Sequence, residues 1–134
     1  MANEKILVVD DEEGLVEIIR MRLKQDGYNV VTAGNGQEAL DLARKEKPDL
    51  VITDYQMPEM DGLALCAEMR KDPILALTPV ILLTAYGMII EETEQSTAGI
   101  NAMMPKPFSP RELLAKVREL LDSLRTPAAP GERE

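Results

Sequence analysis

Five short apolar segments, separated by stretches with helical periodicity, constrain the fold of this 134-residue chain more than any other feature. The first, third and fourth segments are continuous rather than alternating and rich in β-branched residues, which is typical of strands buried on both faces of a parallel sheet. The segments are Lys5–Val9, Tyr28–Ala33, Asp49–Thr53, Pro79–Leu83 and Asn101–Met104. Because strands alternate with helices, the sequence predicts an α/β domain: a doubly wound, five-stranded parallel sheet with helices on both faces.

Between these segments, apolar residues recur at the spacing of amphipathic helices. The apolar stripe of the first predicted helix consists of Leu15, Ile18, Ile19 and Leu23. Further helices are predicted around Ala39–Ala43, Leu63–Met69 and Met88–Thr97. The last helix begins at Ser109–Glu112, where an N-cap serine, a proline and a glutamate three residues after the serine predict a capping box.

The composition changes after Arg125 to a segment rich in proline, alanine and charge. We therefore predict one domain over residues 1–125 and a disordered tail, or the start of a linker, over residues 126–134. A domain of this length buries enough surface to fold without a disulfide or a structural metal. The single cysteine, Cys66, excludes an internal disulfide, and we expect it to be a buried apolar residue of the third helix.

Several classes of function are excluded by residues that the sequence lacks. The chain has no histidine, which excludes a Ser-His-Asp set, an HExxH zinc site and a phosphohistidine on this chain. The net charge of −9 disfavours nucleic acid or an anionic membrane as a direct partner. The apolar segments are too short to span a membrane, so we expect a cytoplasmic domain.

Charged and polar residues follow the predicted strands at their carboxyl ends. Asp10 and Asp11 follow the first strand, Asp54 the third, Thr84 the fourth and Lys106 the fifth. In the flavodoxin-like strand order 2-1-3-4-5, the first and third strands are neighbours, so the three aspartates should converge. Two like charges about 4 Å apart cost on the order of 4 kcal/mol at an effective dielectric of 20, so the cluster needs protonation or a cation. Oxygen ligands without histidine or cysteine favour Mg²⁺.

Such a site suits a phosphoryl group, because a metal and Lys106 offset charge on its oxygens and the Thr84 hydroxyl can donate a hydrogen bond. Asp54 is the better nucleophile because it stands alone at the sheet edge, whereas Asp10 and Asp11 are better suited to hold the metal. Simpler interpretations stay open at this point: the first two aspartates could cap the first helix, and Asp54 could belong to an acidic turn.

Taken together, four motifs resemble the receiver domain of bacterial two-component response regulators over roughly residues 4–124. These motifs are ILVVDDE at Ile6–Glu12, DLVITDYQMPEMDG at Asp49–Gly62, VILLTA at Val80–Ala85 and KPF at Lys106–Phe108. The resemblance implies that Asp54 accepts a phosphoryl group from a histidine kinase or a histidine phosphotransfer protein, and that Asp10 and Asp11 bind Mg²⁺. It implies a phosphoacceptor that assists its own phosphorylation and dephosphorylation, rather than an enzyme.

The resemblance also assigns roles to residues around the acceptor. It implies that the backbone carbonyl of Gln56 completes the metal ligands, that Thr84 is the switch hydroxyl, and that Lys106 contacts the phosphoryl group. It further implies a cis peptide bond before Pro107. The sequence departs from the family at Met103, where receivers often carry a tyrosine or phenylalanine that reports phosphorylation.

Two further expectations concern the lifetime of the acyl phosphate and the output surface. Gln56 and Tyr86 lie where their side chains could screen the acyl phosphate from water. A face made by the fourth helix, the fifth strand and the fifth helix is expected to bind a downstream target or a second copy, since it carries Met88, Ile89, Ile90, Met103 and Met104. The first helix, with Leu15 and Ile18, is the second candidate face and would dock the phosphodonor.

Three alternatives remain at the level of the whole chain. It could be a stand-alone receiver, or the excised first domain of a longer transcription regulator or hybrid kinase. A Mg²⁺-dependent phosphatase with an aspartyl nucleophile is disfavoured, because the acids after the first strand are adjacent and do not form a D-x-D motif. A scaffold that works without phosphorylation is disfavoured because the acidic set and the lysine are all present.

Overall fold

The structure, a computed structural model, describes residues 4–85 and 99–125. Five parallel strands form one sheet in the predicted order, β2-β1-β3-β4-β5. The strands are β1 (Lys5–Val9), β2 (Asn29–Ala33), β3 (Leu50–Asp54), β4 (Val80–Thr84) and β5 (Ala102–Pro105). The helices are α1 (Glu13–Gln25), α2 (Gly36–Glu46), α3 (Gly62–Lys71) and α5 (Pro110–Arg125). The helix predicted at Met88–Thr97 and the predicted tail at 126–134 lie outside the described residues.

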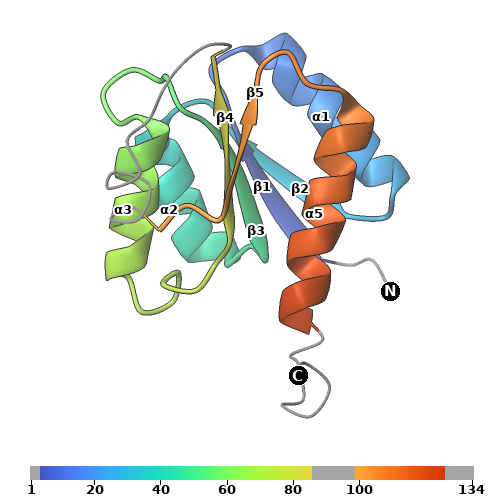
Figure 1. The fold of residues 1–134 in the computed structure, drawn as a ribbon. Helices are drawn as coiled ribbons and strands as arrows, with labels where there is room; N and C mark the ends of the chain where they lie inside the picture. The colour runs from blue at the N-terminus through green and yellow to red at the C-terminus, as the bar shows by residue number, and fades with distance from the viewer. Residues whose placement is uncertain (1–3, 86–98, 126–134) are drawn as a thin grey trace.

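The helices cover both faces of the sheet, as predicted. Helices α1 and α5 lie on one face and α2 and α3 on the other (Figure 1). Successive residues of β1 point to opposite faces, so Ile6 and Val8 join the core under α1 and α5, whereas Leu7 and Val9 join the core under α2 and α3. Both faces of the central strands are therefore buried, which explains why their sequences are continuously apolar.

The strands that carry the polar residues extend slightly beyond the apolar segments. Strand β3 ends at Asp54, which pairs with Leu83 of β4, and β4 ends at Thr84, which pairs with Pro105 of β5. A polar side chain does not end a strand when its backbone still has a ladder partner. The two polar residues are consequently held by the sheet itself.

The sequence predicts a capping box at the start of α5 and leaves open whether Asp10 and Asp11 cap α1. The structure answers both questions. At α5, the Ser109 hydroxyl accepts a hydrogen bond from the Glu112 backbone N–H (3.0 Å), and the Glu112 carboxylate accepts one from the Ser109 N–H (3.2 Å). This confirms the capping box. At α1, the N-cap position is Glu12 and not Asp10 or Asp11, and the Glu12 side chain makes no capping bond.

The burial of the single cysteine agrees with expectation. Cys66 is fully buried on α3, and burial raises the pKa of its thiol. Within the described ranges, the structure contains no helix long and apolar enough to span a membrane.

Candidate functional site

Three carboxylates meet where β1 and β3 end. Asp10 and Asp11 follow β1, Asp54 ends β3, and the two strands are hydrogen-bonded neighbours. One carboxylate oxygen of each residue lies within 4.8 Å of the other two. Asp10 and Asp54 are nearly buried, at 1% and 8% exposed, whereas Asp11 is exposed. The convergence predicted from the strand order is confirmed, and Asp54 retains a small opening to solvent.

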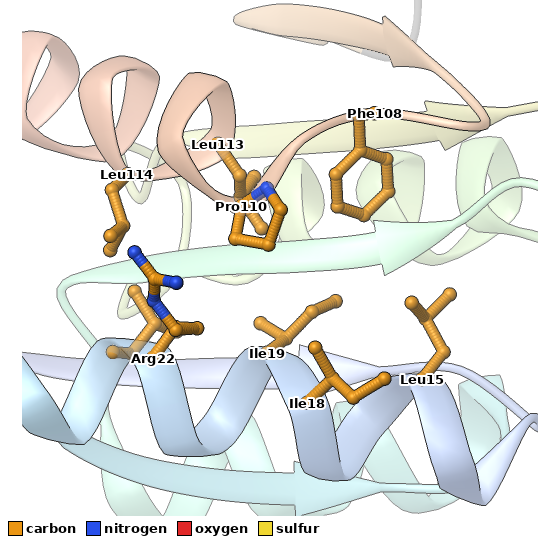
Figure 2. A pocket seen from close by; sticks show the side chains of 9 residues that line it. Leu15, Ile18, Ile19, Arg22, Phe108, Pro110, Leu113 and Leu114 are labelled. Atoms are coloured by element: carbon orange, nitrogen blue, oxygen red, sulfur yellow. The ribbon is translucent and has the colours of Figure 1, made fainter.

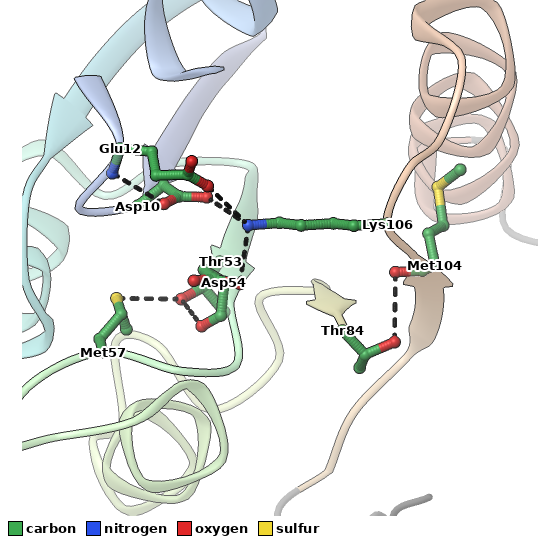
Figure 3. Close-up of polar contacts among 8 residues, drawn as sticks. All are labelled: Asp10, Glu12, Thr53, Asp54, Met57, Thr84, Met104 and Lys106. Carbon is green, nitrogen blue, oxygen red and sulfur yellow. Dashed lines mark hydrogen bonds and ion pairs between the residues drawn. The ribbon is translucent and has the colours of Figure 1, made fainter. Parts of the chain in front are cut away.

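Lys106 reaches these carboxylates from the end of β5, the edge strand of the sheet. The Nζ atom of Lys106 lies 3.1 Å from Asp10 Oδ2, 3.1 Å from Asp54 Oδ1 and 3.4 Å from Glu12 Oε1 (Figure 3). Its backbone N–H donates to Thr84 O (2.6 Å), which extends the pairing of β5 with β4. The peptide bond between Lys106 and Pro107 is cis, as expected.

The pKa values of Asp54 and Lys106 are both raised, but for different reasons. Burial raises the pKa of the Asp54 carboxyl, and the charges of Asp10 and Asp11 raise it further; the hydrogen bond from Lys106 offsets only part of this. Burial lowers the pKa of Lys106, but hydrogen bonds to Asp10 and Asp54 outweigh that effect and raise its pKa overall. Lys106 therefore stays charged at neutral pH and is the counter-ion of the cluster.

The backbone around the carboxylates is fixed by local hydrogen bonds and one close approach. Asp10 Oδ1 accepts from the Glu12 N–H (2.9 Å), which orients that carboxylate. Gly62 donates its N–H to Tyr55 O (2.8 Å), and a Cβ atom at Gly62 would lie 2.5 Å from Asp54 O. Only glycine permits this contact, so the M-D-G sequence at the start of α3 holds the chain after β3 against the end of that strand.

The geometry and chemistry of the carboxylates fit a divalent cation. Oxygen ligands about 2.1 Å from Mg²⁺ lie up to about 4.2 Å apart, so a small rotation of the side chains would bring all three aspartates to one ion. The donors are carboxylate oxygens, which hard cations prefer. A cation would also relieve the repulsion among these carboxylates, because Asp10, Glu12 and Asp54 share the single ammonium group of Lys106.

Thr84 and Met103 lie to one side of this cluster. The Thr84 hydroxyl is nearly buried and donates to Met104 O across β4 and β5 at 3.5 Å, a long contact (Figure 3). The Met103 side chain is 36% exposed on β5. Within the described residues, the Thr84 hydroxyl is thus bonded to a backbone carbonyl, and the group that bonds Asp54 from the β5 side is Lys106.

Gln56 and Tyr86 are the two residues predicted to shield the acyl phosphate from water. The side chain of Gln56 is exposed and lines an open hollow beside Asp11. Tyr86 lies outside the described residues. Sequence reasoning missed Glu12 as a partner of Lys106. The signal was present, because Glu12 directly follows the two aspartates in the ILVVDDE motif.

A second surface feature is an apolar groove between α1 and α5. It has a volume of about 250 Å³, and α1 side chains face side chains from the start of α5 across it (Figure 2). Ile18 lines the groove and is 53% exposed, so it belongs to the apolar spacing of α1 without being buried in the core. Ile19 and Leu23 are buried as expected, and Leu15 is partly buried. The groove is lined by Leu15, Ile18, Ile19, Arg22, Leu23, Phe108, Pro110, Leu113 and Leu114.

A family model and curated relatives both match this chain to response regulators. A model of the response regulator receiver domain matches residues 6–118. The alkaline phosphatase synthesis transcriptional regulatory protein PhoP of Bacillus subtilis is 41% identical over 119 residues, which cover 89% of this chain and 49% of PhoP. The chain spans about half the length of the curated relatives it matches.

The solved structures similar to this chain are also response regulators or receiver domains. The chemotaxis response regulator CheY4 of Vibrio cholerae has a TM-score of 0.82 and 31% identity, covering 89% of this chain and 99% of CheY4. The receiver domain of sensor histidine kinase PA1611 from Pseudomonas aeruginosa has a TM-score of 0.82 and 28% identity, covering 91% of this chain and all of that domain. That domain was solved with a magnesium ion coordinated in its active-site cleft. The chain belongs to the response regulator receiver domain family, whose members are signalling switches of two-component systems rather than classical enzymes.

Proposed function

We propose that this domain is a phosphorylation-dependent switch in which Asp54 accepts a phosphoryl group from a phosphohistidine of a histidine kinase or a phosphotransfer protein. One observation carries the proposal. The Asp54 carboxylate lies within 4.8 Å of those of Asp10 and Asp11 and 3.1 Å from Lys106 Nζ, at the carboxyl edge of a parallel sheet. A nucleophilic carboxylate, a cation site and a fixed ammonium group together are what phosphoryl transfer needs.

In the proposed step, a carboxylate oxygen of Asp54 attacks phosphorus in line with the departing imidazole nitrogen. A P–O bond forms, the P–N bond breaks, and its electron pair leaves with the histidine of the partner. Lys106 holds positive charge beside the phosphoryl oxygens. Mg²⁺, held by Asp10, Asp11, Asp54 and the backbone carbonyl of Gln56, would supply further charge stabilisation when bound. The acceptor thus assists its own modification through position and charge.

The switch itself would follow from the added charge. Phosphorylation adds about 1.5–2 negative charges at Asp54, and this attracts Lys106 and the Thr84 hydroxyl. Thr84 would then exchange its long bond to Met104 O for one to the phosphoryl group. Met103 would move inward as Thr84 rotates, and Gln56 and Tyr86 would set the lifetime of the acyl phosphate by shielding it from water.

The two proposed partner surfaces share helix α5 but otherwise use different elements. We assign the phosphodonor to the α1/α5 groove, because Ile18 and its neighbours offer an apolar surface beside the site. The downstream target, or a second copy, is assigned to β5, α5 and the segment that carries Met88. The curated relatives are about twice as long as this chain and include transcription regulators, so a role within a longer regulator is part of the proposal.

Labelling by acetyl phosphate in the presence of Mg²⁺ tests the acceptor. We expect one phosphoryl group per wild-type chain, measured by intact mass, and none on Asp54→Asn or after addition of EDTA. Asp61→Asn is the matched control, because Asp61 lies in the same loop and caps α3 through a bond that asparagine also makes. Continued stoichiometric labelling of Asp54→Asn would refute the assignment, and steady turnover of phosphate monoesters would favour a phosphatase.

Transfer from purified, autophosphorylated histidine kinases tests the groove. Ile18→Ser should slow transfer from the cognate kinase about tenfold or more, whereas labelling by acetyl phosphate should not change. Ile74→Ser is the matched control, since Ile74 is 56% exposed on the loop between α3 and β4. If both variants accept the phosphoryl group at the wild-type rate, the phosphodonor docks elsewhere.

A further inference from the structure

At the end of the sheet opposite the carboxylates, one arginine connects three segments. Arg70, in the last turn of α3, donates five hydrogen bonds to neutral oxygens. Two go to Gly99 O (3.3 and 2.8 Å) and one to Asn101 Oδ1 (3.0 Å); the others go to Leu75 O and Ala76 O (3.2 Å each). The guanidinium group therefore ties α3 and the loop after it to the residues that lead into β5.

Asn101 passes this restraint on to the sheet. Its side-chain oxygen accepts from the Val80 N–H (2.8 Å) as well as from Arg70, and its own N–H donates to Val80 O (3.1 Å). Val80 is the first residue of β4, so Arg70 fixes the point at which β5 begins to pair with β4. Gly99 has a φ of +77°, and a Cβ atom there would lie 2.6 Å from Arg70 Nε. The close approach of the guanidinium group accordingly requires glycine.

Strand β5 depends on restraints at its two ends. Among the strands of the described residues, it lies at the edge of the sheet and pairs with β4 alone; it has four residues, and Pro105 supplies no backbone donor to the ladder. The pairing runs in unbroken register from Ala102 to Pro105, and the Lys106 N–H continues it to Thr84 O. An uninterrupted strand transmits a lengthwise displacement from one end to the other.

We infer that Arg70 is a positioning residue for Lys106: by holding Gly99 and Asn101, it fixes where β5 lies along β4 and so where Lys106 Nζ sits among the carboxylates. Asn101 and Lys106 are five residues apart, about 16 Å along a strand, so no direct contact is involved. The part of this inference that concerns phosphoryl transfer rests on the proposed function. The part that concerns the position of β5 does not.

Amide hydrogen exchange, measured by NMR on the whole unphosphorylated chain without metal, tests the position of β5. In Arg70→Gln, the amides of Asn101 and Lys106 should both exchange about tenfold faster or more, because the strand loses one of its two end restraints. The amide of Val51, which donates to Pro79 O, should be unchanged. Arg44→Gln is the matched control, since Arg44 pairs with Asp72 on the same side of the molecule and leaves β5 untouched.

The pattern of exchange decides between explanations. Faster exchange at Asn101 with an unchanged Lys106 amide would mean that Arg70 ties down only its own loop. An equal increase at Asn101, Lys106 and Val51 would mean a general loss of stability. Either result overturns the inference. Gly99→Ala tests the same contact without changing the arginine, because the new Cβ atom would displace the Arg70 guanidinium group. It should give the same pattern of exchange as Arg70→Gln.

The functional arm uses acetyl phosphate and Mg²⁺. Arg70→Gln should label about fivefold more slowly than wild type, because Lys106 is less often in place, whereas the Mg²⁺ affinity followed by the Asp11 amide shift should not fall, because the three aspartates are unaltered. Unchanged labelling would overturn the link to Lys106. If the wild-type chain is not labelled at all, the proposed function fails, and the exchange data still judge the position of β5.

Discussion

The two helical layers that cover the sheet differ in how closely they pack. In the α2/α3 layer, two glycines allow backbone contacts that no other residue would. A Cβ atom added at Gly36 would lie 2.6 Å from Met60 O, and one added at Gly62 would lie 2.5 Å from Asp54 O. In the α1/α5 layer, the helices instead leave a groove of about 250 Å³ with Ile18 half exposed. One layer is closed against the sheet, and the other is open.

The two layers therefore have different roles: one holds the acceptor in place, and the other leaves surface for a partner. The closed layer holds the chain that follows Asp54, since Gly62 both donates to Tyr55 O and lies against Asp54 O. A rigid backing keeps the acceptor carboxylate in one place, which in-line transfer requires. The open layer lies beside the same carboxylates and leaves apolar surface for a partner to cover. Rigidity and access are thus supplied by opposite faces of one sheet.

Leucine truncations should show the largest contrast between the layers. Leu65 on α3 is completely buried, so Leu65→Ala should destabilise the domain by about 4 kcal/mol, through lost burial and a sealed cavity. Leu114 on α5 borders the groove, so Leu114→Ala should cost only about 2 kcal/mol, because the lost volume joins a space already open to solvent. Urea denaturation measures both values, and equal losses would contradict the description of two unlike layers.

Adding a methyl group at Gly62 should sharpen the same contrast from the opposite direction. Gly62→Ala should destabilise by about 2 kcal/mol, because the new Cβ atom meets Asp54 O and the Leu82 side chain at 2.5 Å. Gly14→Ala, in the first turn of α1, should stabilise by about 0.5 kcal/mol, since a Cβ atom there has no neighbour within 4 Å. Thermal unfolding distinguishes the two signs.

Ile18 should contribute little to folding. Ile18→Ser should change the free energy of unfolding by no more than about 0.5 kcal/mol, because the side chain is 53% exposed. The measurement is urea denaturation beside the transfer assay described above. A large loss of stability would mean that the open layer is packed more tightly than its geometry indicates.

The smallest expected effect is a pH dependence confined to the closed layer. The Ile74 N–H and Arg44 both donate to Asp72, and these bonds lower the pKa of its carboxyl below the ordinary value of 3.8. The carboxylate form therefore stabilises the fold at neutral pH, and this contribution is lost as pH falls through the lowered pKa. Stability should decline less steeply below about pH 4 in Asp72→Asn than in wild type, and parallel curves would contradict this.

Much of the fold could be predicted because the relevant signals are local. Continuous apolar segments identified the buried strands, and the serine and glutamate of the capping box identified the start of α5. The meeting of Asp10 and Asp54 also followed, because the strand order alone brings those strand ends together. These predictions required only periodicity, end signals and topology.

The rest depends on contacts between segments that the sequence does not relate. Ile18 fits the apolar spacing of α1, but periodicity does not say whether α5 comes close enough to cover it. Arg70 and Gly99 have no common motif, and their contact exists only because α3 ends beside the start of β5. Glu12 belongs to the ILVVDDE motif, yet its contact depends on how far the Lys106 side chain extends from the end of β5.

The short connection from Lys106 to α5 has a mechanical consequence. Helix α5 begins at Pro110, and the Ser109–Glu112 capping box fixes its first turn to the backbone just after the lysine. Its 16 residues make a rod about 24 Å long. If a rearrangement around the lysine pivots this rod by about 5°, the far end swings by about 2 Å, as follows from that length. The domain can thereby amplify a sub-ångström event among charged atoms into a movement that a neighbouring molecule could sense.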